Sequence, residues 1–227
     1  MPASDWSTGI PSPNVYDVPR DWIRVRSRDF FGRCVRSPHG AHAVVWRNAR
    51  YERETGKLRS MGFFVMIEDQ RVRVSGDVHR VMMAAVSDAG TFVIACGPRR
   101  PGDLQSTVYV VGANGTIVIE QWIDALVDTG AISFDGRYVV VQAACGNGDQ
   151  GHCHAWDIDR RVLLWRRRLL GPWPTRLAVD PDLERLHAQV GLDVEGPTAT
   201  FDLMTGGAPG GRSETDVPAV VAASHPA

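Results

Sequence analysis

The sequence lacks any apolar run long enough to cross a bilayer. No stretch approaches ~18 consecutive apolar residues, and the N-terminal residues 1–6 contain neither a basic segment nor an apolar one. Four cysteines in 227 residues are too few and too irregularly spaced for a disulfide framework. We therefore expect a cytoplasmic protein with reduced thiols and no membrane partner.

A strong net charge is also missing. The chain has 25 Lys and Arg against 26 Asp and Glu, and its formal net charge is −1. This balance gives no bulk attraction to a polyanion, so we expect no nucleic-acid partner. With 44% hydrophobic and 22% charged residues, the composition is that of an ordinary globular protein, and the length suits one domain.

Catalytic motifs are absent too. There is no Gly-x-Ser-x-Gly nucleophile elbow and no Gly-x4-Gly-Lys-Ser/Thr phosphate loop. Asp193 and Glu195 form a carboxylate pair, but spacing alone assigns them no reaction. The chain therefore favours a non-catalytic role without a cofactor. An enzyme stays open as an alternative, because an active site can gather residues that are distant in the sequence.

What the sequence does contain is a repeated turn. Residues 37–40, 87–90 and 133–136 each begin with Ser and end with Gly, and residues 179–182 form a degenerate fourth copy. A short apolar run follows each turn, and successive copies are 46 to 50 residues apart. Strands on both sides of a Gly turn at this period are typical of a β-propeller.

The third repeat shows most clearly how one blade is divided into strands. A strand over 129–133 enters the Asp135-Gly136 turn, which is a strong hairpin signal. The next strand, 137–144, is apolar on both alternating faces, as expected for a strand covered on both sides. Strands over 153–158 and 162–166 complete four antiparallel strands, and the second repeat divides in the same way.

The fourth repeat has no outer strand, whereas residues 22–26 alternate apolar and basic side chains and belong to no repeat. We predict an all-β, four-bladed propeller whose ring is closed by residues 22–26 pairing into the last blade. The alternative is a half-ring completed by homodimerisation, so the protein is a monomer or a homodimer. The propeller spans 19–206, and residues 1–18 and 207–227 are flexible tails rich in small residues and Pro.

The repeats resemble those of the WD-repeat and YVTN-type propeller superfamily. The resemblance rests on the apolar–Ser-x-Asp-Gly–apolar pattern and on Trp156-Asp157, which is similar to the Trp-Asp dipeptide of WD repeats. The strand Leu164-Trp165-Arg166 is similar to the closing strand of quinoprotein-type propellers. These resemblances imply a propeller that serves as a platform for binding another protein. They do not establish what it binds.

Long loops gather on one face of the predicted ring, and such loops on rigid strands commonly carry recognition. We expect this face to act as a protein-interaction or scaffolding surface. A small-ligand or sugar site that uses Trp173 is an alternative. The predicted binding residues are Arg50, Tyr51, Arg53, Arg99, Arg100, Asp103, Asn147, Asp149, His152, Trp173, Asp193 and Glu195.

A metal site is a weaker hypothesis. His152 and His154 are two residues apart and share a strand face, with Cys145 and Cys153 nearby as further candidate ligands. The spacing matches no recognised zinc motif, and ordinary hairpin residues explain the pattern equally well. If a metal were bound near the ring axis, the chain would be a hydrolase, lactonase or lyase. We otherwise predict no metal.

Overall fold

The computed structural model describes residues 6–8, 22–25, 30–52, 55–69, 71–98, 102–168, 174–190 and 198–208. Every regular element among them is a β-strand. The strands form four antiparallel sheets, called sheets 1 to 4 in chain order, and one separate two-stranded hairpin. The predicted all-β class is confirmed, and the sheets stack in a propeller-like manner.

Sheets 2 and 3 have the four strands that the repeats predict. Each runs as a meander in which neighbouring strands in the chain pair with one another. Sheet 2 contains β9 (Val81–Val86), β10 (Phe92–Cys96), β11 (Ser106–Val111) and β12 (Ile117–Ile123). Sheet 3 contains β13 (Ala125–Ile132), β14 (Tyr138–Gly146), β15 (His152–Asp157) and β16 (Val162–Arg168).

The first sheet has more than four strands, and the last sheet has fewer. Sheet 1 has six, in the order β1-β2-β3-β4-β7-β8, and sheet 4 has three. Sheet 1 contains β1 (Trp6–Thr8), β2 (Trp22–Val25), β3 (Phe30–Arg36), β4 (His42–Arg47), β7 (Gly62–Glu68) and β8 (Arg71–Val78). Sheet 4 contains β17 (Pro174–Asp180), β18 (Arg185–Val190) and β19 (Thr198–Asp202). The separate hairpin pairs β5 (Arg50–Tyr51) with β6 (Leu58–Ser60).

The three Gly turns have the same backbone geometry. Gly40, Gly90 and Gly136 have φ angles of 79°, 80° and 81°, a region that favours glycine because it has no Cβ. Each glycine N–H donates to the carbonyl of the Ser three residues earlier, at 2.9, 3.2 and 2.9 Å. The same local sequence therefore produces the same turn in each of the first three sheets.

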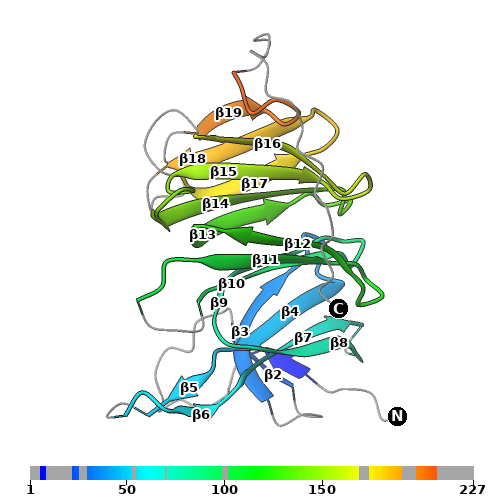
Figure 1. Ribbon diagram of the computed structural model, residues 1–227. Helices are drawn as coiled ribbons and strands as arrows, with labels where there is room; N and C mark the ends of the chain where they lie inside the picture. The colour runs from blue at the N-terminus through cyan, green and yellow to red at the C-terminus, as the bar shows by residue number, and fades with distance from the viewer. Residues whose placement is uncertain are drawn as a thin grey trace.

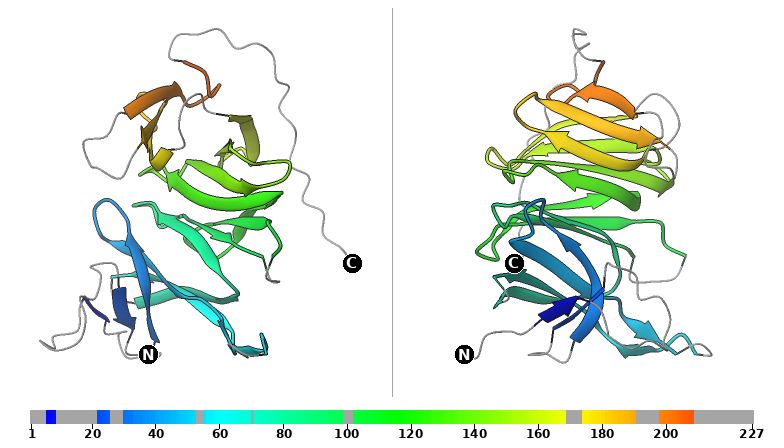
Figure 2. Two further views of the ribbon diagram at one scale, coloured as in Figure 1. Left: turned by 90° about the vertical axis from the view of Figure 1, so that its left-hand side faces the viewer. Right: turned by 180° about the vertical axis from the view of Figure 1, so that it is seen from behind.

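The sheets stack face to face through three apolar layers. Sheets 1 and 2 meet through Met66 and Phe92, among others, and sheets 3 and 4 meet through Trp165 and Leu186. Between sheets 2 and 3 lies a larger cluster that includes the fully buried Trp156. Figures 1 and 2 show the resulting order, with sheet 1 and sheet 4 at opposite ends of the stack.

The predicted closure by residues 22–26 is wrong. β2 pairs with β3, in the register Trp22↔Arg33 to Val25↔Phe30, and β19 pairs with β18. Within the described chain no strand of sheet 1 pairs with a strand of sheet 4. The physical reason is local: β3 begins five residues after β2 ends, so this pairing closes a short loop at low entropic cost.

The last sheet has one apolar and one polar face. Leu177, Leu186 and Phe201 face sheet 3, whereas the opposite face carries polar side chains such as His187 and Thr200, whose Nδ1 and Oγ1 are 3.3 Å apart. A polar outer face is what a terminal repeat needs to remain solvated. The described part of the chain contains no helix with the length and apolar character needed to span a bilayer.

Candidate functional site

A groove of about 1040 Å³ separates the outer strands of sheets 1 and 2. One wall comes from β7 and β8, and the other comes from β10, β11 and β12. The connection between β10 and β11 contributes its described residues Gly97, Pro98, Asp103 and Gln105 to one end of the groove. The two sheets therefore pack tightly through their inner strands and separate toward their outer strands.

The size of the side chains on the outer strands of sheets 1 and 3, β8 and β16, explains why this space stays open. β8 presents Val74 and Gly76 to the groove. The fourth strand of sheet 3, β16, presents Trp165 to sheet 4, where the indole N–H donates to the Leu203 carbonyl at 2.7 Å. A large aromatic ring thus fills the gap between sheets 3 and 4. Between sheets 1 and 2, the groove-facing residues Val74 and Gly76 of the corresponding outer strand, β8, are too small to fill the gap.

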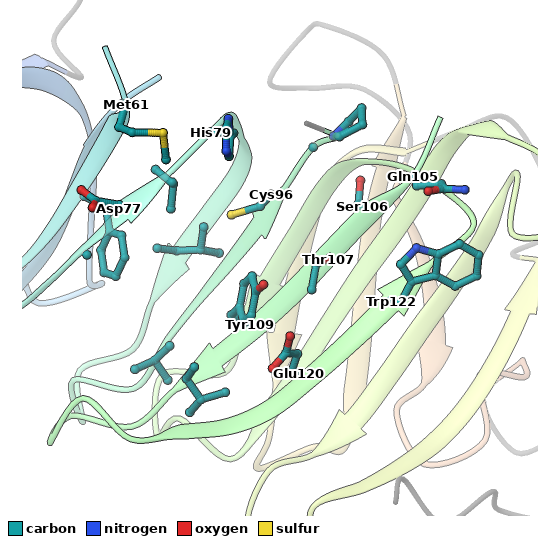
Figure 3. Close-up of a pocket in the computed structure, with 18 of the residues that line it drawn as sticks. Met61, Asp77, His79, Cys96, Gln105, Ser106, Thr107, Tyr109, Glu120 and Trp122 are labelled. Atoms are coloured by element: carbon teal, nitrogen blue, oxygen red, sulfur yellow. The ribbon is translucent and has the colours of Figure 1, made fainter. Parts of the chain in front are cut away.

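Aromatic side chains line both walls of the groove. The Phe64 ring lies over Gly76, since a Cβ at residue 76 would be 2.8 Å from its Cε1. On the opposite wall, Tyr109 lies beside Glu120 across two paired strands, and Trp122 is opposite Thr107. Figure 3 shows Glu120 and Trp122 on one strand, β12, with Tyr109 on the neighbouring strand. Trp122 is 53% exposed.

Three carboxylates from three different elements border the same groove. Asp103 precedes β11, and Glu120 lies on β12 on the same face as Tyr109. Asp77 lies at the edge on β8, where its pairing with Phe63 puts its side chain on the face turned away from the groove. All three are exposed. The described lining contains no Lys or Arg. The groove therefore combines an apolar interior with negative charge.

The β5–β6 hairpin projects away from the stacked sheets (Figure 1). Its contact with His79 places it beside one end of the groove. Tyr51 joins the two features, because its hydroxyl lies 3.0 Å from Nδ1 of His79, a lining residue. Met61, which follows β6, also lines the groove, and Figure 3 places it near His79. Of the predicted binding residues, Arg50 and Tyr51 thus lie on an exposed hairpin next to the groove, and Asp103 lies in it.

The predicted residues of the 146–152 loop lie in sheet 3 and do not line this groove. Asp149 is buried and holds the loop in place: it accepts hydrogen bonds from the Asp124 backbone N–H at 2.8 Å and from Arg166 Nε at 2.5 Å. Burial raises the pKa of Asp149, but these bonds and the nearby His154 outweigh it and lower the pKa overall. Asn147 is exposed, and its backbone N–H donates to the Asp124 carbonyl at 3.0 Å.

The four candidate metal ligands do not gather. His154 and Cys153 are buried, His152 is half-buried, and Cys145 is exposed. Cys153 is opposite Gln142 in the sheet register, and all four cysteines are free thiols. Among the described residues, no group of three or more His, Cys, Asp or Glu side chains is placed to hold a metal.

Half of the predicted binding set falls outside the described residues: Arg53, Arg99, Arg100, Trp173, Asp193 and Glu195. Sequence reasoning missed Glu120 and Trp122, because it assigned residues 116–120 to an outer strand without a role. The available signal was a large aromatic two residues after a carboxylate on an outer strand. Such a pair shares one face of the sheet.

No protein-family model and no curated protein sequence matches the chain. Among solved structures, the chain is similar to hydrazine synthase of Kuenenia stuttgartiensis, with a TM-score of 0.47 and 18% identity over 75% of this chain. It spans 45% of the hydrazine synthase chain. A likeness at this level carries no functional argument. The function therefore has to be argued from the groove itself.

Proposed function

We propose that this protein is a non-catalytic binding module with four propeller blades. It recognises another protein through the groove between sheets 1 and 2 and the adjoining β5–β6 hairpin. The observation that carries the proposal is the groove of about 1040 Å³ with the exposed Trp122 on its wall. Concave sites with an apolar lining and a few polar groups are the usual form of binding sites.

Two features favour a polypeptide partner. The groove is bordered by β8 and β12, which are both terminal strands of their sheets in the described chain and so have a free edge. The exposed hairpin adds Tyr51 and Leu58, which are 42% and 45% exposed, beside the groove. Aromatic residues are enriched among the side chains that dominate protein–protein binding. The groove and the hairpin together form one continuous surface.

Selection from a random-peptide display library tests the proposal, with the full chain as bait. We expect enriched peptides to bind the wild-type protein and to lose about 30-fold in affinity on Trp122→Ala, the loss of a typical hot spot. Phe134→Ala is the matched control, because Phe134 is an exposed aromatic (42%) in the tight turn of sheet 3. Failure to enrich any peptide, or equal loss in both variants, would contradict the proposal.

A small-ligand or sugar site is the second candidate, and the exposed Trp122 next to Glu120 favours it. A flat aromatic face beside a hydrogen-bonding carboxylate suits a polyol ring. A glycan array separates the two functions. Binding of a defined glycan that Trp122→Ala abolishes, without peptide enrichment, would replace the protein-binding proposal with this one.

A further inference from the structure

Several acidic groups elsewhere in the described chain form ion pairs, whereas the carboxylates of the groove do not. Elsewhere Glu68 pairs with Arg73 at 2.6 Å, and the buried Asp157 pairs with Arg137 at 3.2 Å. Asp77, Asp103 and Glu120 form no ion pair with any described residue. Because the described lining also holds no Lys or Arg, the negative charge of the groove is not neutralised there.

The carboxylates lie beside apolar and aromatic surface. Glu120 and Trp122 are two residues apart on β12 and share a face, and Tyr109 is the cross-strand neighbour of Glu120. Phe64 and Val74 form the facing wall. A ligand in this groove therefore meets an aromatic ring, an aliphatic wall and an unpaired carboxylate within one site.

Arginine and lysine side chains match this combination. Each has an aliphatic stem that packs on apolar surface and a cationic head that remains polar. The head is attracted both to carboxylates and to the face of an indole ring. An acidic segment would instead place like charges next to Asp103 and Glu120 and would be repelled.

We infer that the groove between sheets 1 and 2 binds a lysine- or arginine-bearing extended segment of a partner protein. This inference rests on the proposed function. The cationic head lies at Glu120 and Trp122, and the stem lies along Phe64 and Val74. Asp103, from the connection between β10 and β11, holds a further basic residue of the segment. The edge strands β8 and β12 leave room for an extended backbone.

Fluorescence anisotropy with three labelled dodecapeptides of alternating composition tests this inference. The probes are Ser-Lys, Ser-Gln and Ser-Glu repeats, and the protein is the full chain at low and at physiological salt. We expect the lysine peptide to bind at least about tenfold more tightly than the glutamine peptide and to weaken as salt increases. The glutamate peptide should not bind. Because the chain has a net charge of only −1, uniform attraction of a cation to its surface is small.

Charge-matched variants locate the binding. We expect Glu120→Gln to weaken binding of the lysine peptide about fivefold, and the double variant Asp103→Asn/Glu120→Gln to weaken it more. Asp182→Asn is the control, because Asp182 is an exposed carboxylate in the distant turn of sheet 4. Equal binding of the lysine and glutamine peptides, or an equal effect of Glu120→Gln and Asp182→Asn, would overturn the inference.

Failure of this inference can be told apart from failure of the proposed function by comparing these results with the peptide selection. If the selected peptides require Trp122 but contain no Lys or Arg, the protein-binding function stands and its specificity for basic segments fails. If no selected peptide requires Trp122, the proposed function itself fails.

Discussion

The carboxylate of Asp88 accepts two hydrogen bonds from His39. The His39 backbone N–H donates to Oδ1 at 2.9 Å, and its ring Nδ1 lies 2.7 Å from Oδ2. Asp88 and His39 belong to equivalent turns of sheets 2 and 1. The Asp88 backbone N–H in turn donates to the carbonyl of Phe134, in the turn of sheet 3, at 2.9 Å. One residue thus links the tight turns of three consecutive sheets.

This linkage predicts acid sensitivity. Burial raises the pKa of Asp88, but the hydrogen bonds from His39 and Ser37 outweigh it, so the pKa lies below its usual value. A carboxyl with a lowered folded-state pKa stabilises the protein above about pH 4, and that contribution is lost as the pH falls through the folded pKa. We expect Asp88→Asn to cost about 1 kcal/mol of unfolding free energy at pH 7 and less at pH 3. Urea denaturation at both pH values, with Asp182→Asn as control, measures this; an equal cost at both would contradict it.

A second pH dependence comes from His154. Burial lowers the pKa of His154 to about 4, an effect that the Asp149 carboxylate opposes. Between about pH 6.5 and pH 4 the unfolded chain binds a proton that the folded protein does not bind. The folded state therefore loses up to about 3 kcal/mol of stability as the pH falls across this window.

Replacing His154 by a residue that does not titrate should flatten that profile. We expect His154→Gln to be less stable than the wild type at pH 7 but to change less between pH 6.5 and pH 4. His187→Gln, in the half-buried outer face of sheet 4, is the control. Urea midpoints across this range decide the matter, and parallel profiles for the wild type and His154→Gln would refute the prediction.

The cysteines should differ in reactivity. Burial raises the pKa of Cys153 to about 12, so at pH 8 about one thiol in ten thousand is a thiolate. Cys145 is exposed on the neighbouring strand β14. We expect iodoacetamide at pH 8 to label Cys145 in the folded protein and to leave Cys153 unmodified until urea is added. Peptide mass spectrometry reads both sites, and equal labelling in the folded protein would show that Cys153 is accessible.

Strands and turns could be predicted from sequence because their signals are local. Gly136 supplies a positive φ that few other residues adopt, and the flanking apolar runs specify strands. The predicted strands over 153–158 and 162–166 differ from β15 and β16 only at their ends. The alternation of Trp22 to Val25 likewise predicted a strand correctly, although not its partner.

The residues of the candidate site were harder to predict from the sequence than the strands were. Asp149 was predicted as a binding residue because it lies in a polar loop, yet it is buried and bonded to Arg166. Conversely, Trp122 was overlooked, because the local sequence does not show that its side chain faces an open groove. That groove lies between two sheets whose facing residues are distant in the chain.

The sequence by itself determined the repeat, the Gly turns and the number of stacked sheets, because each depends on residues that are neighbours in the chain. Only the tertiary structure decided which sheet receives β2 and where two sheets separate to form a groove. Strand partners and cavities depend on contacts between distant residues, and the alternation of apolar and polar side chains is the same whichever partner a strand meets.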